Sequence, residues 1–529
     1  MKTATKTLPG ELPSELPDDV DMLKQLLLER ESLWRECGQT LRDNYQSLLE
    51  QWRLARHKQF GASSEASPGQ GELFDEAEQL AAAEDAEQIT DGVADETAPA
   101  KQRKTRRSRL PENLPRERVV IDIDDKNCDC CGGELHQVGE ETSEKLEFIP
   151  ARIKVIEQVR PQYGCRTCER EGTAVAFQIA PVPPSPIPKS IATPSLLAQI
   201  ISAKFQYGLP LYRQESMFQQ YGIELSRKAM SIWMLRCAEL LSPVYRLLHQ
   251  HLLNQPVLWA DETTLKVVEV KERSKCYMWV YGSGADRPGE NDLRNIVLYD
   301  YQGGREHRHP VSFLSSYQGY LQVDGYAAYE QTGATLIGCM AHARRRFKEA
   351  QIAQPKGKTG KADWALNQIQ KLYRIETEYR GQPPNEIQRQ RQQRAIPLLD
   401  QLKTWLEKSA MHVPPKSLLG KAIHYTLRQW PKLVRYVDDG RLNIDNNRAE
   451  RAIKPFVIGR KNWMFSNTEN GASASATLYS LVESAKANGV VPFDYLSYLL
   501  SELPKLAPEA DLEHLMPWNV SLPASPVAG

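Results

Sequence analysis

Three acidic residues lie in sequence contexts that suggest a specific role for the carboxylate. Asp261 interrupts the apolar segment "VLWADETTLKV", Asp324 closes "GYLQVDGY", and Glu450 lies in the charged segment "DNNRAERAIKP". A buried acid is unfavourable unless it faces solvent, a cation or a metal ion. Each acid also has an ordinary explanation: a strand-end cap or salt bridge for Asp261, a turn before Gly325 for Asp324, and an i,i+4 pair with Lys454 for Glu450.

The order of the elements around these acids favours a shared site. Five β segments begin near residues 257, 275, 295, 319 and 334, and a charged helix follows from about 445. A first-strand Asp, a fourth-strand Asp and a late helix acid match a ribonuclease H-like arrangement, in which the carboxylates converge on two divalent cations. The acids are 63 (324 − 261) and 126 (450 − 324) residues apart. We therefore expect a multidomain α/β chain whose ribonuclease H-like core, a mixed β-sheet with helices, carries a helical insertion over residues 351–440.

Several polar residues near the acids are candidates for supporting roles. His342, after the last predicted strand, could orient a water or a scissile phosphate, or could instead cap a helix. Cys339 is expected to pack in the core. Asn447 and Lys454 lie within about a turn of Glu450, and Lys454 is the better candidate for a phosphate contact. Phosphate contacts are also predicted for a basic track, with an ordinary basic helix face as the alternative: Arg344, Arg345, Arg346, Arg460 and Lys461.

Four of the nine cysteines form two CxxC pairs: Cys128, Cys131, Cys165 and Cys168. Two thiolates on one tight turn cannot fill a tetrahedral zinc site, whereas two such turns can. The spacing predicts a structural zinc ribbon over residues 110–180, and the alternation in "RVVIDID" and "KVIEQVRPQYGC" predicts short strands within it. Cys130 and His136 are competing ligands, and a redox-active dithiol is the alternative, although it would need only one pair.

Charge is strongly segregated although the formal net charge is zero. Residues 65–100 hold eleven acids and no Lys or Arg, and the nine residues 101–109 hold six cations. Such blocks are typical of solvated linkers, and a basic block can also bind nucleic-acid phosphates. Arg103, Lys104, Arg106 and Arg107 are the candidates. The chain has no apolar segment of membrane-spanning length and no signal core, so we expect a soluble, cytoplasmic, nucleoid-associated protein.

Two helical regions complete the organisation. Residues 20–58 repeat Leu27, Trp34, Leu41 and Leu48 every seven positions, but the complementary positions are mostly polar, which predicts an imperfect coiled coil. A helix packed on its own chain is the alternative. Residues 195–254 suit a helix-turn-helix, with a break at Gly222, a cap at Ser226 and DNA contacts from Arg227 and Lys228; a plain three-helix core would look similar.

These observations predict nine segments. They are an N-terminal helix (1–60), an acidic then basic linker (61–109), the zinc ribbon (110–180), a Pro-rich spacer (181–194), the DNA-binding helices (195–254), the first part of the core (255–350), the insertion (351–440), the final core helices (441–500) and a tail (501–529).

The chain resembles the DDE transposases of the insertion sequence 66 family over nearly its whole length. The resemblance is carried, in order, by "FGASSE", the paired cysteines with "CGG", "LPLYRQE", "ADET", "QVDGYAAY", "CMAHARRRF", "DNNRAERAIKPFVIGRKNW" and "ESAKANGVVPFDYL". It implies an N-terminal oligomerisation and DNA-binding region, a zinc-binding segment, and a ribonuclease H-like core with Asp261, Asp324 and Glu450 as the acidic triad. It also suggests accessory partners from the same element. Cys130 departs from the expected pattern.

The function predicted from these features is magnesium- or manganese-dependent cleavage at insertion-sequence ends and strand transfer into target DNA. The protein would act as a homo-oligomer on paired element ends, with zinc as a structural ion. Two alternatives are a non-catalytic zinc-containing DNA-binding protein on a degenerate core and a structure-specific nuclease. Three intact acids favour catalysis over the degenerate core.

Overall fold

The computed structural model describes residues 19–60, 153–163, 178–270, 275–354 and 360–522. The chain divides into two units, which are described separately: Met1–Val93 with Ser185–Ser521, and Ala94–Pro184 with Leu522–Gly529. The four predicted zinc ligands and the basic segment 101–109 lie outside the described residues.

The smaller unit contains one short strand pair. Strand β1 (Gln162–Tyr163) pairs antiparallel with β2 (Gln178–Ile179). Residues 153–161 are exposed and form no strand. The segment "KVIEQVRPQYGC" was predicted as a longer strand, and this prediction was wrong for residues 154–161, since only the last two described residues of the segment pair.

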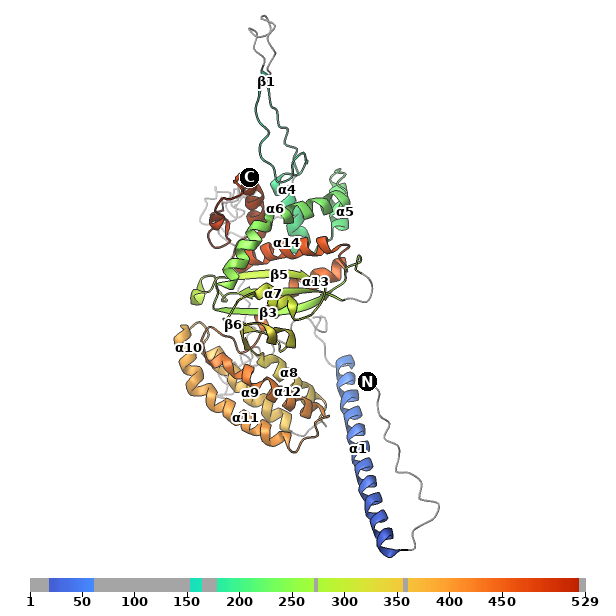
Figure 1. The fold of residues 1–529 in the computed structure, drawn as a ribbon. Coiled ribbons are helices and arrows are strands. Elements are labelled where there is room, and N and C mark those ends of the chain that lie inside the picture. The colour runs from blue at the N-terminus through green and yellow to red at the C-terminus, as the bar shows by residue number, and fades with distance from the viewer. Residues whose placement is uncertain (1–18, 61–152, 164–177, 271–274, 355–359, 523–529) are drawn as a thin grey trace, which may run out of the picture. The chain divides into compact units, whose positions relative to one another are not determined.

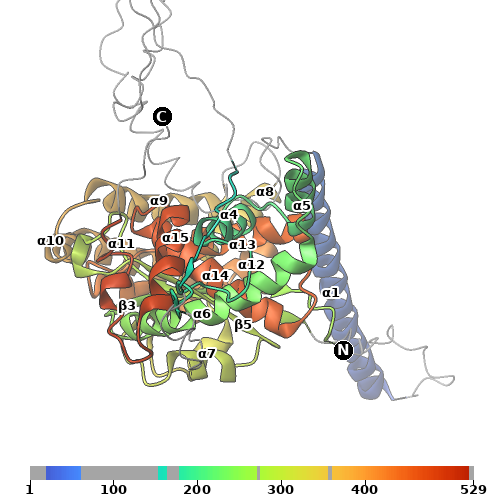
Figure 2. The ribbon, with the colours of Figure 1, turned by 90° about the horizontal axis from the view of Figure 1, so that it is seen from above.

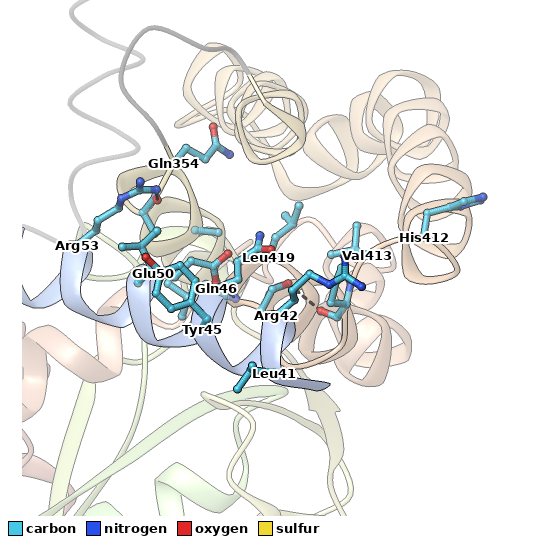
Figure 3. A pocket seen from close by; sticks show the side chains of 16 residues that line it. Leu41, Arg42, Tyr45, Gln46, Glu50, Arg53, Gln354, His412, Val413 and Leu419 are labelled. Carbon is cyan, nitrogen blue, oxygen red and sulfur yellow. Dashed lines mark hydrogen bonds between the residues drawn. The ribbon is translucent and has the colours of Figure 1, made fainter. Parts of the chain in front are cut away.

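The larger unit begins with the helix α1 (Val20–Phe60), as predicted. Its seven-residue series Leu27, Trp34, Leu41 and Leu48 is exposed. The C-terminal half of α1 bonds to later parts of the unit. Arg53 Nη1 donates to the carbonyl of Ala353 at 3.2 Å, and Glu50 Oε2 accepts from the backbone N–H of Leu418 at 2.9 Å. A cavity of about 960 Å³ lies there, and its lining includes Leu41, Tyr45, Glu50, Val413 and Leu419 (Figure 3).

A mixed sheet of five strands lies at the centre of the larger unit: β3 (Val257–Leu265), β4 (Cys276–Ser283), β5 (Ile296–Gln302), β6 (Tyr320–Gln322) and β7 (Thr335–Ile337). The spatial order is β5-β4-β3-β6-β7. The first three strands form an antiparallel meander, and β6 and β7 run parallel to β3. All five predicted β segments contain a strand, so the prediction of a mixed sheet with helices is confirmed.

The helices α4 (Pro194–Phe205), α5 (Leu211–Gln220) and α6 (Arg227–Leu253) precede the sheet. Gly222 has a φ of +73°, which lets the chain turn after α5, and Ser226 caps α6 by accepting from the N–H of Ala229 at 3.2 Å. Both predicted signals therefore mark the break. The later part of α6 packs on the sheet, where the Tyr245 hydroxyl donates to the Tyr299 carbonyl at 2.9 Å.

Helix α14 (Glu469–Ala487) covers the outer edge of the sheet, next to β5 (Figures 1 and 2). An edge strand presents unpaired backbone groups that a neighbour must satisfy when they are buried. Two serine hydroxyls of α14 do so: Ser480 Oγ accepts from the N–H of Tyr299 at 2.7 Å, and Ser484 Oγ accepts from that of Val297 at 3.0 Å. Helix α15 (Pro492–Glu502) follows, so the predicted pair of final helices is confirmed.

A second helical body follows the sheet (Figure 1). Its main helices are α8 (Met340–Ile352), α9 (Lys361–Glu378), α10 (Pro384–Gln390), α11 (Ile396–Ala410) and α12 (Leu418–Leu433). They have a hydrophobic core of their own, which includes Phe347, Leu372, Leu402 and Tyr436. The chain then returns to the sheet through α13 (Asn447–Trp463). No helix in the described ranges is long and apolar enough to span a bilayer.

Candidate active site

The parallel pairing of β3 and β6 sets two of the predicted acids side by side. Trp259 pairs with Gln322, a difference of 63 positions (322 − 259), and Asp261 and Asp324 differ by the same 63 (324 − 261). Both acids thus lie two residues beyond the last β3–β6 pair: Asp261 in the middle of β3, and Asp324 just past the carboxyl end of β6. They are close enough for the charge of Asp324 to act on Asp261. Gly325, with a φ of +99°, turns the chain immediately after Asp324.

Glu450 reaches these acids from the first turn of α13. The start of the helix is fixed to β3, because the Asn446 amide donates to the Ala260 carbonyl at 2.9 Å. Glu450 is only 7% exposed, and neither carboxylate oxygen has a hydrogen-bond partner among the described residues. Its Oε1 lies 3.8 Å from His342 Nδ1. The alternative ion pair with Lys454 does not form in the part of the chain that the structure describes.

The charges of the three acids act on one another, with Glu450 buried and Asp261 and Asp324 half-buried. Burial raises the pKa of Asp261 well above its ordinary value, and the charges of Glu262 and Asp324 raise it further. Burial also raises the pKa of Glu450 to about 9, with Asp261 contributing and Arg345 opposing. Burial and mutual repulsion make the charged form of these carboxylates unfavourable, and a bound cation would offset both effects. Carboxylates are the donors that magnesium and manganese prefer. The residues therefore fit a divalent metal centre.

A polar network holds the start of α13. Asp445 accepts from the Asn447 N–H at 3.1 Å, so it satisfies a free donor of the helix end. Its other oxygen accepts from the Tyr373 hydroxyl at 2.9 Å and from the Asn447 side-chain amide at 3.0 Å. Gln322 Nε2 donates to the Asp445 carbonyl at 2.6 Å. The Asn447 amide is thus engaged in positioning the helix that carries Glu450.

A second network, not predicted from the sequence, supports the middle of β3 next to Asp261. Glu262 Oε1 accepts from Arg305 Nε at 2.9 Å, and Glu262 Oε2 accepts from the Tyr329 hydroxyl at 2.8 Å. The Arg305 guanidinium lies 3.7 Å from the ring centroid of Tyr326. This network fixes the strand position next to Asp261. The only signal in the sequence was a second acid directly after the first.

Cys339, His342 and Glu450 bring one potential ligand atom each to within 4.8 Å of one another. Cys339 is buried, as expected for core packing, and its sulfur accepts from the Asn446 N–H at 3.2 Å. Burial lowers the pKa of His342 to about 4, so its imidazole is neutral at neutral pH.

The comparison with known proteins decides the family. A family model described as "Transposase IS66 family" matches residues 189–474, more than half of the chain. The chain belongs to the IS66 family of transposases. Three further models of this family match other parts: the zinc-finger binding domain over residues 125–169, "Transposase C of IS166 homeodomain" over 47–119, and the IS66 C-terminal element over 480–518.

Two relatives from Sinorhizobium fredii (strain NBRC 101917 / NGR234) share much of the chain. Uncharacterized protein y4jD is 36% identical over 423 residues, which cover 78% of this chain and 81% of the relative. Uncharacterized protein y4qI is 34% identical over 404 residues, covering 74% of this chain and 73% of the relative. As a member of the IS66 family, the chain belongs to a family of DNA-binding, phosphoryl-transfer enzymes that use divalent metal. The zinc-finger match spans all four predicted cysteine ligands and implies zinc.

The predicted basic residues of this IS66 transposase differ in their surroundings. The positive charge of Arg345 lowers the pKa of both Glu450 and His342. Arg346 is exposed and lies 4.1 Å from the ring centroid of Tyr425, whose hydroxyl donates to the Asp324 carbonyl at 3.1 Å. Lys454 is half-buried on α13.

Two arginines of the predicted basic track are engaged within the protein. Arg344 is only 7% exposed, and its charge opposes the rise that burial causes in the pKa of Tyr373. It therefore does not present a phosphate-binding surface here. Arg460 Nη1 donates to the Thr263 and Thr264 hydroxyls at 3.2 Å. In contrast, Lys461 is exposed, as are Arg227 and Lys228 at the start of α6.

Proposed function

We propose that this chain is a catalytically competent IS66 transposase that cleaves DNA at the ends of its element and joins the ends to target DNA. Asp261, Asp324 and Glu450 would hold the catalytic magnesium or manganese ions. The observation that carries the proposal is the placement of these acids: Asp261 within β3, Asp324 just past the end of the neighbouring parallel strand β6, and Glu450 at a helix start, in a sheet ordered β5-β4-β3-β6-β7. We interpret this topology as a ribonuclease H-like core with α9 to α12 as its helical insertion.

The chemistry supplied by such ions when bound is activation of a nucleophilic hydroxyl and stabilisation of the leaving oxygen of a phosphodiester. The protein's own groups would do the positioning. Arg345, which already offsets the charge at Glu450, is suited to neutralising a phosphate that enters the site. Burial lowers the pKa of His342, which favours a neutral imidazole that would donate its N–H to a scissile phosphate oxygen, or exchange a hydrogen bond with a water, without repelling the metal ions.

DNA would be held along a basic surface outside the acids. The exposed residues Arg346 and Lys461, together with Lys454, are candidates near the core, and Arg227 and Lys228 are candidates on the helix that follows the α5–α6 turn. We interpret α5 and α6 as a helix-turn-helix, since the break at Gly222 and the cap at Ser226 give two short-linked helices with exposed cations at the second start. The predicted zinc ribbon and Arg103, Lys104, Arg106 and Arg107 would add contacts from the other unit.

We also propose that the protein acts as a homo-oligomer on paired ends, with possible accessory proteins from the same element. The support is the series Leu27, Trp34, Leu41 and Leu48, which is exposed on α1 and repeats at the coiled-coil period.

The test is an assay of DNA carrying the element's terminal repeats and a target plasmid, with magnesium and with chelator. We expect magnesium-dependent nicks at the repeat ends followed by joined products, and no products from Glu450→Gln. Cleavage without joining would instead indicate a nuclease. DNA binding without cleavage by either protein would indicate a non-catalytic binding protein.

A further inference from the structure

Three side chains with metal-binding atoms form a cluster that shares Glu450 with the acidic site, and one of them, Cys339, has no part in the function proposed above. Cys339 immediately precedes α8, His342 lies in the first turn of α8, and Glu450 enters from α13. Their ligand atoms all lie within 4.8 Å of one another. Ligands around one tetrahedral ion at bond lengths of about 2.0–2.3 Å lie about 3–4 Å apart, so small side-chain movements would complete the geometry.

The state of the shared ligand, Glu450, also points to a bound cation. The Glu450 side chain is 9% exposed, and both of its oxygens are buried without a hydrogen bond in the described part of the chain. A buried carboxylate in that state is costly, and the closest described ring nitrogen, His342 Nδ1, lies 3.8 Å from Oε1. The acids Asp261 and Asp324 can share a hard ion with Glu450, but they give no role to the thiol of Cys339.

The chemistry of the cluster favours a soft metal. Sulfur and imidazole nitrogen are preferred by zinc, cobalt and cadmium, whereas magnesium prefers oxygen ligands. A set of one sulfur, one nitrogen and one carboxylate oxygen also leaves a fourth position of a tetrahedron for water.

We propose that Cys339, His342 and Glu450 form a second metal site that takes a thiophilic divalent ion such as Zn²⁺. On binding, the Cys339 thiol loses its proton to solvent, and the thiolate, a ring nitrogen of His342 and a Glu450 oxygen become the ligands. Because Glu450 is shared, a soft ion held here withdraws one ligand from the magnesium site and inhibits the enzyme. The binding stands on the cluster alone, and only the inhibition rests on the proposed function.

The binding is tested by titrating the full-length protein, prepared with one zinc ion per chain for the predicted zinc ribbon, with Co²⁺ and recording thiolate-to-cobalt charge-transfer absorption and the number of ions bound per chain. We expect one ion more for the wild type than for Cys339→Ser or His342→Ala. Cys276→Ser is the matched control, since Cys276 is also buried and its sulfur also accepts one hydrogen bond, from Tyr301 at 3.4 Å. Circular dichroism checks that every variant is folded.

Equal stoichiometry and equal spectra for wild type and folded Cys339→Ser would overturn the proposal. The inhibition is tested separately by adding Zn²⁺ to magnesium-dependent cleavage. We expect wild type and Cys276→Ser to lose activity and Cys339→Ser to need at least about tenfold more zinc, the scale on which one lost partner weakens a metal site. An extra cobalt ion in a protein that cleaves no DNA would uphold the site and refute only the proposed function.

Discussion

At the scale of single residues, the buried acids differ in how they are compensated. Asp445 accepts three hydrogen bonds and holds the helix start, whereas Glu450 has no hydrogen-bond partner in the described part of the chain. An acid whose hydrogen bonds are satisfied stabilises the fold, and an acid without them is available to a ligand. The two acids, five positions apart in one segment, therefore have different expected mutational effects.

Removing the support of Asp445 should lower stability. Tyr373→Phe deletes the hydroxyl that donates to the buried Asp445 carboxylate, and we expect a loss of about 1–3 kcal/mol in the free energy of unfolding. The measurement is urea unfolding followed by tryptophan fluorescence. Tyr379→Phe, which removes a hydroxyl that contacts Arg394 at the surface, is the control and should change stability by less than about 0.5 kcal/mol. Equal effects of the two variants would refute the stabilising role of Asp445 at the start of α13.

Asp300 gives a prediction on pH dependence. Burial raises its pKa from 3.8 to about 6. Between about pH 4 and pH 6, Asp300 is therefore more protonated in the folded state than in the unfolded state. The free energy of unfolding falls over this range as pH rises, and the loss remains at higher pH. We expect Asp300→Asn to stabilise the protein by about 2–3 kcal/mol at pH 7 and to have little effect at pH 4. Unfolding curves at the two pH values test this, with exposed Asp400→Asn as control; a gain that is the same at both pH values would contradict it.

At the scale of elements, the periodicity of the sequence predicted the strands and helices but not their partners. The five β segments and the helix carrying Glu450 follow from local apolar patterning. The networks at Glu262 and Asp445 do not, because Tyr329 and Tyr373 lie 67 and 72 residues away from the groups they bond. Residues 154–161 were wrongly predicted as a strand, because alternation there has no neighbouring strand to pair with among the described residues.

The edge of β5 gives a prediction at this scale. Ser480→Ala and Ser484→Ala each leave a buried backbone N–H of β5 without its acceptor, so we expect each to lower the free energy of unfolding by about 1–3 kcal/mol. Ser473→Ala on the exposed face of α14 is the matched control and should be close to neutral. Hydrogen exchange at Val297 and Tyr299 reports the same effect locally. Unchanged protection of both amides in the serine variants would show that α14 does not seal this edge.

At the scale of the whole molecule, the larger unit contains two helical regions besides those that pack on its five-stranded sheet. Helix α1 presents apolar residues at seven-residue spacing, and α8 to α12 form a body with its own core. The acids that the sequence singled out are those that this arrangement brings together, because the register of β3 and β6 fixes the first two and the return of the chain through α13 supplies the third.

Self-association through α1 is testable at this scale. Charges placed in the exposed apolar series, Leu27→Glu with Trp34→Glu, should dissociate the oligomer, because each buries a charge in any coiled-coil seam. Analytical ultracentrifugation measures the change, and Gln39→Glu on the same helix is the control. An unchanged mass for the double variant would exclude this seam as the interface.

The central claim is that Asp261, Asp324 and Glu450 form one metal site that performs both DNA cleavage and strand joining. The most direct measurement is the rate of each step, using intact element ends for cleavage and pre-cleaved ends for joining, for Asp261→Asn, Asp324→Asn and Glu450→Gln at equal DNA occupancy. We predict that every variant binds DNA like the wild type and loses both steps by at least about a hundredfold, the scale of losing one group that stabilises transition-state charge. A folded variant of any of the three that keeps the wild-type rate of either step would contradict the account.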